Sequence, residues 1–214
     1  MHLIAIALAI VLVQAAPQAA PPATPPAEPA PPPVPTGPVV ALDVVQGRTA
    51  LGTITIALNQ EKAPISVKNF LSYVRSGHYD GTVFHRVMGT FMIQGGGYTA
   101  ELEEKPTQAP IRNEARNGLR NSRGAVAMAR LTPPDSASSQ FFINLKDNHM
   151  LDFGIGGAGY AVFGQVIEGM DVVDRISAVS TTSRGQHQNV PQVAVVIRRA
   201  REVQAAAPVA DPKP

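Results

Sequence analysis

Proline divides this chain into a segment that cannot bury a core and a segment that can. Residues 17–38 contain 11 of the 20 prolines, mixed mainly with alanine and carrying a single charge, Glu28. Such a tract favours the extended polyproline conformation and behaves as a semi-rigid spacer. The last residues are also rich in alanine and proline. We therefore expect a disordered linker over 17–37, a folded domain over 38–202 and a disordered tail over 203–214.

An unbroken apolar run, LIAIALAIVLV, occupies positions 3–13. A membrane-spanning helix needs about 18–20 apolar residues, whereas a secretory signal needs a shorter run followed by small residues. Small residues follow at Ala15 and Ala16, although no Lys or Arg precedes the run. We expect residues 1–16 to be a signal peptide and the protein to be exported. If the segment stays uncleaved, it would tether the protein to a membrane instead.

Composition excludes several classes of site. The chain has no cysteine, which rules out disulfides and thiolate metal ligands. The formal net charge of +2 is too small to indicate a nucleic-acid partner. No two of the five histidines stand at H-x-x-x-H spacing, and the G-x-S-x-G motif of serine hydrolases is absent. The sequence therefore predicts neither a metal site nor a nucleophilic serine.

Short β-rich runs dominate the folded segment, and only two helical patterns interrupt them. One helix is predicted to begin at Pro64, with apolar residues at three- and four-residue spacing, and to end near Gly77; a second covers 172–176. The predicted strands are 39–45, 52–58, 83–87, 91–94, 125–129, 140–144, 161–166 and 193–197. Many short strands with two helices favour a closed antiparallel sheet.

Two glycine-rich stretches invite a phosphate-binding interpretation that their context opposes. GIGGAG, at 154–159, matches G-x-G-x-x-G, but a predicted strand follows it where a dinucleotide site needs a helix. We interpret it as a flexible loop. The triplet at 95–97 lacks the Gly-Lys-Ser/Thr of a phosphate loop. Glycines after a strand more often mark a bulge or a close approach of two backbones.

Arg86 is harder to explain as part of an ordinary core. Side chains alternate between the faces of a strand, so Phe84 and Arg86 are expected to share one face. Phe91, Met92 and Gln94 would return on the neighbouring strand. This set predicts an apolar pocket with a cation and an amide at its edge. The alternative is a surface arginine that lies over apolar side chains.

Several stretches together resemble the cyclophilins, a family of peptidyl-prolyl cis-trans isomerases. They are FHRVMGTFMIQGGG (84–97), NEARNGLRNSRGAVAMAR (113–130), SASSQFFINL (136–145), MLD (150–152) and YAVFGQVIEGMDVVDRI (160–176). The second stretch and the N-terminal apolar run resemble the bacterial periplasmic branch. The resemblance implies a mostly β fold, a closed eight-stranded antiparallel barrel capped by two α-helices, with the substrate groove on its outside.

The resemblance also implies an activity. It is the rotation of X-Pro peptide bonds, which assists the folding of exported proteins in the periplasm and needs no cofactor or metal. The implied partners are unfolded or flexible proline-containing polypeptides, and we expect a monomer. The alternative is a proline-binding or holdase module without catalysis.

Site residues follow from the same resemblance. The family's catalytic arginine falls on Arg86, with Gln94 and Phe91 as the other catalytic positions. The implied substrate-binding residues are His85, Met92, Ala129, Arg130, Gln140, Phe142, Met150, Leu151 and Tyr160. Three of these depart from the commonest family pattern: Met150 replaces a frequent Trp, Tyr160 a frequent His and Arg130 a frequent Asn. The resemblance implies that Met150 weakens sensitivity to cyclosporin while activity survives, and that Arg130 alters sequence preference more than rate.

Overall fold

The computed structural model describes residues 37–155 and 157–204. The predicted signal peptide, nearly all of the predicted linker and most of the predicted tail lie outside these residues. The last strand of the domain ends at Val203. Within the described ranges, no helix has the length and hydropathy needed to cross a membrane.

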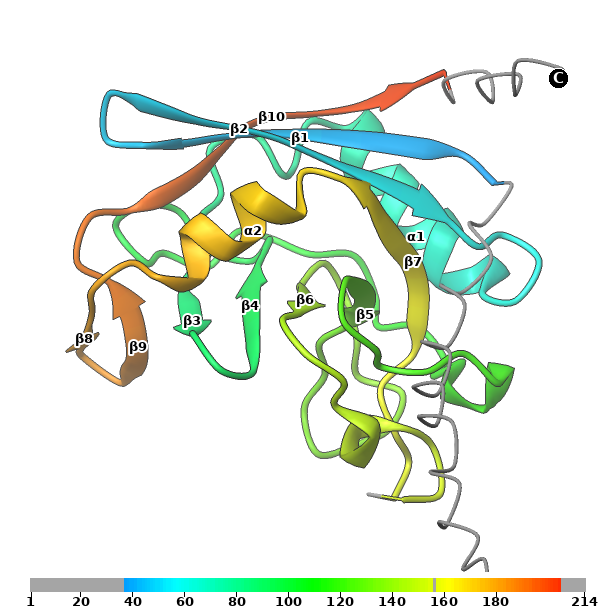
Figure 1. The fold of residues 1–214 in the computed structure, drawn as a ribbon. Coiled ribbons are helices and arrows are strands. Elements are labelled where there is room, and N and C mark those ends of the chain that lie inside the picture. The colour runs from blue at the N-terminus through cyan, green and yellow to red at the C-terminus, as the bar shows by residue number, and fades with distance from the viewer. Residues whose placement is uncertain (1–36, 156, 205–214) are drawn as a thin grey trace, which may run out of the picture. The chain divides into compact units, whose positions relative to one another are not determined.

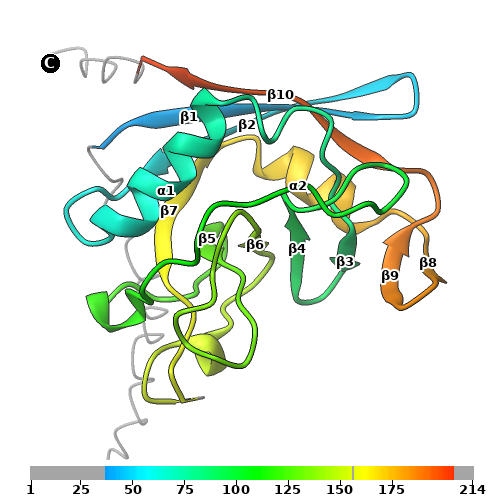
Figure 2. The same cartoon turned by 180° about the vertical axis from the view of Figure 1, so that it is seen from behind.

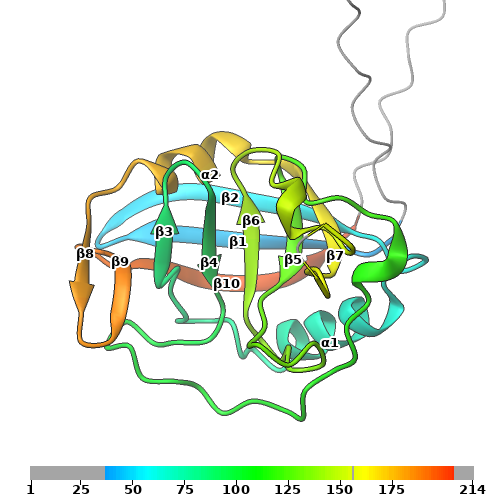
Figure 3. The same ribbon diagram turned by 90° about the horizontal axis from the view of Figure 1, so that it is seen from below.

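Eight strands form one antiparallel sheet that curls into a barrel (Figure 1, Figure 3). In spatial order the strands are β10, β1, β2, β7, β5, β6, β4 and β3. Their bounds are β1 Val39–Gln46, β2 Thr49–Leu58, β3 Arg86–Met88, β4 Met92–Gly95, β5 Ala125–Met128, β6 Phe141–Asn144, β7 Val162–Glu168 and β10 Val195–Val203. A separate hairpin consists of β8 Thr181–Arg184 and β9 His187–Pro191.

The residues just before β3 close the barrel. Val83 forms an antiparallel bridge with Val196 in β10. The amide of Phe84 donates to the carbonyl of Val195 at 2.9 Å, and the amide of Ile197 donates to the carbonyl of Thr82 at 2.8 Å. These bonds join the two ends of the eight-stranded order. The predicted eight-stranded antiparallel barrel with two helices is thereby confirmed.

Two helices cover the barrel on opposite sides, α1 at Pro64–Arg75 and α2 at Met170–Ser177 (Figure 2, Figure 3). The predicted start of α1 at Pro64 is correct, since proline is favoured in the first turn, where its missing N–H is not needed. The predicted apolar face of α1 is buried in the barrel core. Its Phe70 ring lies 5.1 Å from Phe163 and 5.4 Å from Phe141, centre to centre.

Alternation along the strands gives the barrel two apolar faces. On β6, Phe141 and Ile143 belong to the interior core, and the Phe142 side chain between them belongs to a second cluster outside it. On β4, Ile93 faces inward and Met92 outward. This period of two is the ordinary consequence of strand geometry. An outward apolar cluster of this kind offers a surface for a ligand.

One expectation about the faces is wrong. Phe84 lies in the interior core, whereas Arg86 lies on the outer side of the barrel with the second cluster. The predicted strand over 83–87 is not continuous, because residues 82–84 bond to β10 whereas β3 begins only at Arg86 and pairs with β4. The change of partner breaks the alternation. The Arg86 guanidinium therefore stands beside Met92 and Phe142 instead of Phe84.

The β8–β9 hairpin has no counterpart among the predicted strands. Its sequence, TTSRGQHQNVP, carries almost no apolar alternation, and most of its residues are exposed. Its turn lies at Gly185, which has a φ of +58°. The local pattern was too polar to indicate strands.

Candidate active site

A hollow of about 250 Å³ lies on the outer face of β4, β5 and β6. We call it the outer hollow. Its floor is the second apolar cluster, in which Met92 is 2% exposed and Phe142 4% exposed. It is lined by Arg86, Phe91, Met92, Gln94, Ala129, Arg130, Phe142, Leu151 and Tyr160. The lining is apolar except for the two arginines, one glutamine and one tyrosine hydroxyl.

Arg86 and Gln94 form the polar edge of the outer hollow. They are directly paired across β3 and β4. Nη1 of Arg86 donates to Oε1 of Gln94 at 3.5 Å, and Nε2 of Gln94 donates to Oε1 of Gln140 at 2.9 Å. The long first bond leaves most of the five guanidinium N–H groups available. A fixed cation therefore faces an apolar hollow with donors to spare.

The glycine triplet after β4 permits this arrangement by close packing. A Cβ on Gly96 would lie 2.8 Å from the Tyr79 ring and 3.0 Å from the Phe141 ring, and the residue has a φ of +87°. A Cβ on Gly97 would lie 2.5 Å from Cγ of Gln140. Only glycine lets the Gln140 side chain lie against this backbone and reach Gln94. The triplet thus serves packing and positioning, in accord with the close-approach interpretation.

Arg130 and Tyr160 form the opposite side of the outer hollow. The Arg130 guanidinium lies 4.5 Å from the centre of the Tyr160 ring, which meets Phe142 edge-on at 5.7 Å. Nε of Arg130 donates to the carbonyl of Gly159 at 2.9 Å, and Nη1 donates to that of Leu131 at 2.9 Å. This arginine is held by stacking and by backbone bonds, so it fixes the shape of the hollow.

The structure brings most of the twelve predicted site residues together. Nine line the outer hollow. Gln140 lines an adjoining hollow of about 290 Å³, which shares Gln94, Ala129 and Arg130 with the first. His85 and Met150 line neither of these two hollows. Met150 is 61% exposed in the short 3-10 helix His149–Leu151, and His85 is buried.

His85 packs in a small aromatic cluster away from the outer hollow. Its ring lies 4.7 Å from Tyr98 and 6.3 Å from His187, centre to centre. Its Nδ1 is buried without a hydrogen-bond partner. Burial, followed by the neighbouring His187 and Arg86, lowers the pKa of His85 from its ordinary 6.5 to about 4. The imidazole is therefore neutral at pH 7.

This buried histidine predicts a loss of stability in mild acid. Between about pH 6.5 and pH 4 the unfolded chain binds a proton at His85 that the folded chain does not, so the free energy of unfolding falls as the pH falls. The group should account for about 2 kcal/mol between pH 8 and pH 5. Urea unfolding of the wild type and of His85→Gln at several pH values measures it. The variant should show the shallower decline, and parallel curves would contradict the assignment.

A buried polar network behind the outer hollow was not foreseen from the sequence. Asn121, Asn144 and Asn148 are 0% exposed, and Asp152 is 9% exposed. The Oδ1 atom of Asp152 accepts from the backbone amide of Asn121 at 2.7 Å and from its Nδ2 at 3.0 Å. Nδ2 of Asn144 donates to Oδ1 of Asn121 at 3.2 Å. Asn144, a polar residue at the end of the apolar run QFFIN, is the sequence signal that could have indicated it.

The network reaches two sides of the outer hollow. Nδ2 of Asn148 donates at 2.9 Å to Oδ1 of Asn144 and at 2.9 Å to the backbone carbonyl of Phe91. The amide of Leu151 donates to the backbone carbonyl of Asn148 at 2.8 Å. Phe91 and Leu151 are thereby held by bonds from one buried cluster. The network positions the hollow without lining it.

Known proteins are similar to this chain over most of its length. The model of the family described as cyclophilin type peptidyl-prolyl cis-trans isomerase/CLD matches residues 44–202. A peptidyl-prolyl cis-trans isomerase of Acinetobacter baylyi is 58% identical over 158 residues, 74% of this chain and 84% of that protein. Peptidyl-prolyl cis-trans isomerase B of Escherichia coli is 51% identical over 157 residues, 72% of this chain and 96% of that protein.

A solved structure supports the fold. The crystal structure of a cyclophilin type peptidyl-prolyl cis-trans isomerase from Cryptosporidium parvum matches with a TM-score of 0.64 at 22% identity. The match covers 79% of this chain and 99% of the other. At this identity the likeness concerns the fold alone.

Proposed function

Since this chain belongs to the cyclophilin-type peptidyl-prolyl cis-trans isomerases and is an enzyme of that activity, we propose that it acts on X-Pro bonds of exported proteins, in the outer hollow. The observation that carries the proposal is the half-buried guanidinium of Arg86 at the edge of an otherwise apolar hollow. Gln94, Phe91 and the substrate-binding residues that line the hollow complete the proposed site.

Rotation about an X-Pro bond requires no covalent catalysis. The planar bond is held by resonance, which sets a barrier of about 18–20 kcal/mol and makes uncatalysed exchange take tens to hundreds of seconds. In the twisted transition state the resonance is lost, and the proline nitrogen carries a localised lone pair. An enzyme accelerates the rotation if it binds this twisted form better than either planar form.

Arg86 is placed to make that difference. A guanidinium N–H directed at the proline nitrogen gains a hydrogen bond only when the lone pair is free, so the interaction strengthens in the transition state. Arginine stays charged at any ordinary pH and holds its donors in a rigid fork. Gln94, paired across the strands at 3.5 Å and itself held by Gln140, orients the fork.

The apolar floor of the outer hollow holds the proline ring while the rest of the peptide turns. Met92 and Phe142 are almost fully buried and therefore fixed in place. Phe91 and Leu151 stand at the sides, tied to the buried network. A rigid apolar seat favours the compact pyrrolidine ring over longer side chains. The preceding carbonyl would then be free to turn.

We also propose that the protein works in the periplasm on unfolded exported chains. The support is the apolar run at 3–13 followed by small residues, which is typical of a secretory signal. The proline-rich tract that follows would act as a spacer. Fractionation of cells that express the intact chain tests this part, and recovery of the protein only from the cytoplasm would contradict it.

The exchange rate of an Xaa-Pro tetrapeptide tests the activity itself. Substoichiometric amounts of the full chain should shorten the exchange from tens of seconds to below about one second. Peptide binding without faster exchange would instead indicate a proline-binding module on this fold. The two outcomes separate the proposed enzyme from a holdase.

A further inference from the structure

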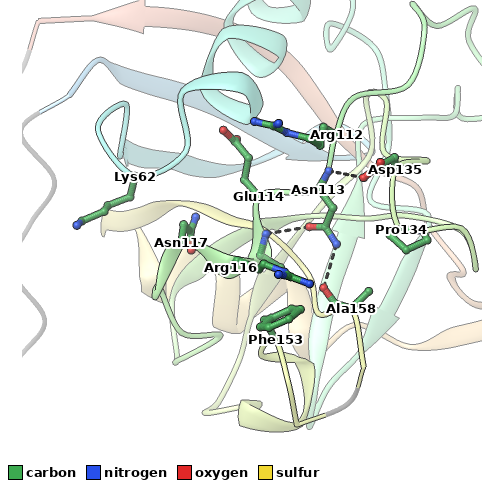
Figure 4. A pocket seen from close by; sticks show the side chains of 11 residues that line it. Lys62, Arg112, Asn113, Glu114, Arg116, Asn117, Pro134, Asp135, Phe153 and Ala158 are labelled. Carbon is green, nitrogen blue, oxygen red and sulfur yellow. Dashed lines mark hydrogen bonds between the residues drawn. The ribbon is translucent and has the colours of Figure 1, made fainter.

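A second hollow, of about 570 Å³, is lined in part by Phe153 and Ala158, which lie between Leu151 and Tyr160 in the chain (Figure 4). Basic side chains reach it from two parts of the chain. Lys62 lies just before α1, and Arg112 and Arg116 lie in the segment between β4 and β5. A neighbouring hollow of about 480 Å³ shares Arg116 and adds Arg120. Four cations therefore line two adjacent hollows, which share Ala115, Arg116 and Phe153 and which we together call the recess.

The carboxylates of this recess are already engaged. Glu114 accepts hydrogen bonds from the amides of Ile65 and Ser66 at 3.0 and 2.7 Å and from the Ser66 hydroxyl at 2.7 Å, which caps the start of α1. Asp135 accepts from the amide of Asn113 at 2.8 Å. Asp152, which lines the neighbouring hollow, accepts from the amide of Asn121 at 2.7 Å. These bonds hold the carboxylates in place without removing their charge, so three carboxylates stand against four cations.

The cations, in contrast, have few partners. Among residues 37–155 and 157–204, Arg112 and Arg120 form no ion pair. Lys62 lies 3.9 Å from Glu61, and both side chains are more than half exposed, so this contact is weak. The recess keeps an excess of positive charge that an incoming anion can neutralise.

Exposed apolar side chains lie beside these cations. Phe153 is 42% exposed and Ile155 is 69% exposed. The Arg116 guanidinium lies 4.5 Å from the centre of the Phe153 ring, and Figure 4 shows the two side by side. Large exposed apolar groups next to unpaired charges are typical of protein-binding surfaces. We call Lys62, Arg112, Arg116, Arg120, Phe153 and Ile155 the basic surface.

The basic surface and the outer hollow share one short stretch of chain. Ala158 lines the basic recess, and Tyr160 lines the outer hollow. The carbonyl of Gly159, between them, accepts from Nδ2 of Asn113 at 3.1 Å and from Nε of Arg130 at 2.9 Å. Two residues of chain span at most about 7 Å. An extended peptide with its proline in the outer hollow needs only a few further residues to reach the basic surface.

We propose that the basic surface is a second binding site for the substrate polypeptide. It takes an acidic segment with apolar side chains that neighbours the proline being isomerised. The inference rests on the proposed function, because it assigns the outer hollow to proline. Charge attraction would speed encounter, and holding the neighbouring segment would raise the local concentration of the X-Pro bond at the outer hollow. Only Gly159 separates Ala158 of the recess from Tyr160 of the outer hollow, so one peptide can reach both, which favours a peptide over a lipid surface.

The test compares two substrates on charge-reversed proteins. One substrate is an Xaa-Pro tetrapeptide, and the other is a peptide of about twelve residues with Glu, Asp and Phe flanking the same Xaa-Pro pair. The full-length variant R116E/R120E should turn over the tetrapeptide within about twofold of the wild type and lose about tenfold in kcat/KM on the acidic peptide. R48E/R199E makes the same change of charge on the exposed part of β1–β2 and β10, and it should keep both rates.

Other outcomes would overturn the proposal. A folding defect in R116E/R120E could also lower its activity. The neutral variant R116Q/R120Q separates the two causes, because the proposal requires it to show a smaller loss in the same direction. Equal kcat/KM on the acidic peptide for R116E/R120E and the wild type would contradict a second substrate site. Loss of binding to vesicles containing phosphatidylglycerol, with peptide kinetics unchanged, would assign the surface to a membrane instead.

A separate measurement keeps this inference distinct from the proposed function. Fluorescence anisotropy of the labelled acidic peptide reports binding without turnover. Its affinity for the wild type should fall steeply between about 50 mM and about 500 mM salt. If the wild type fails to accelerate the tetrapeptide, the proposed function fails. If the acidic peptide binds no better than one with Lys in place of Glu and Asp, the basic surface fails.

Discussion

Replacing Arg86 by alanine is expected to lower kcat/KM for an Xaa-Pro tetrapeptide by about 10²–10³-fold. The loss should fall mainly on kcat, because the guanidinium acts on the twisted transition state and the apolar floor still holds the proline ring. Stability should change little, since the side chain is only half-buried and its one side-chain bond, to Gln94, is long. Exchange kinetics at several substrate concentrations, measured on full-length protein, separate kcat from KM.

Two further variants sharpen this test. Arg86→Lys keeps the charge but removes the rigid fork, so it should recover only a small part of the activity. Arg48→Ala removes an exposed arginine from the β1–β2 turn and should leave the activity as it is. Near wild-type turnover by Arg86→Ala would show that the proposed mechanism is wrong.

The largest loss of stability is expected from Asn144→Leu. Leucine has the same branched shape and number of side-chain heavy atoms, so the change leaves no cavity but strands several polar groups. Nδ2 of Asn148 and Oδ1 of Asn121 lose a partner, as does the carbonyl of Ala125, which accepts from Asn144 at 3.1 Å. Each unsatisfied buried group costs about 1–3 kcal/mol. We expect the free energy of unfolding to fall by about 3–5 kcal/mol.

Urea denaturation followed by circular dichroism measures this loss. The matched control is Ile143→Leu on the same strand, a volume-conserving change in the barrel interior that should cost less than about 1.5 kcal/mol. Asn144→Leu should also raise KM for peptide, because Asn148 holds the Phe91 carbonyl through the same network. A loss no larger than that of the control would show that the network contributes little.

Much of the barrel could be predicted from local pattern. The spacing of apolar residues after Pro64 indicates α1, and alternating runs locate most strands to within a few residues. The failure at Phe84 has a physical cause. Residues 82–84 bond to β10, more than a hundred positions away, and nothing in their own sequence reveals that partner. Long-range pairing decided which face Arg86 occupies.

The site was predictable mainly through resemblance. Strand alternation and residue type alone singled out Arg86 and the neighbouring Phe91, Met92 and Gln94. They did not indicate that Phe142, Leu151 and Tyr160 line the same hollow. The buried asparagine network escaped notice because its members come from three separate segments. The basic surface escaped notice for the same reason, since its cations precede α1 or follow Ile111, and its apolar groups belong to the loop after Leu151.

The closure of the barrel at Thr82–Phe84 and β10 has a consequence for how the enzyme handles unfolded chains. An open sheet presents a row of unpaired backbone groups, and an extended polypeptide can add to it as a further strand. A folding enzyme that captured its clients in this way would hold them by many backbone bonds and risk seeding their aggregation. Here the bonds from Phe84 and Ile197 leave no such row at the seam. On the proposed function, clients would be held through a proline ring and a few side chains, which is compatible with rapid release.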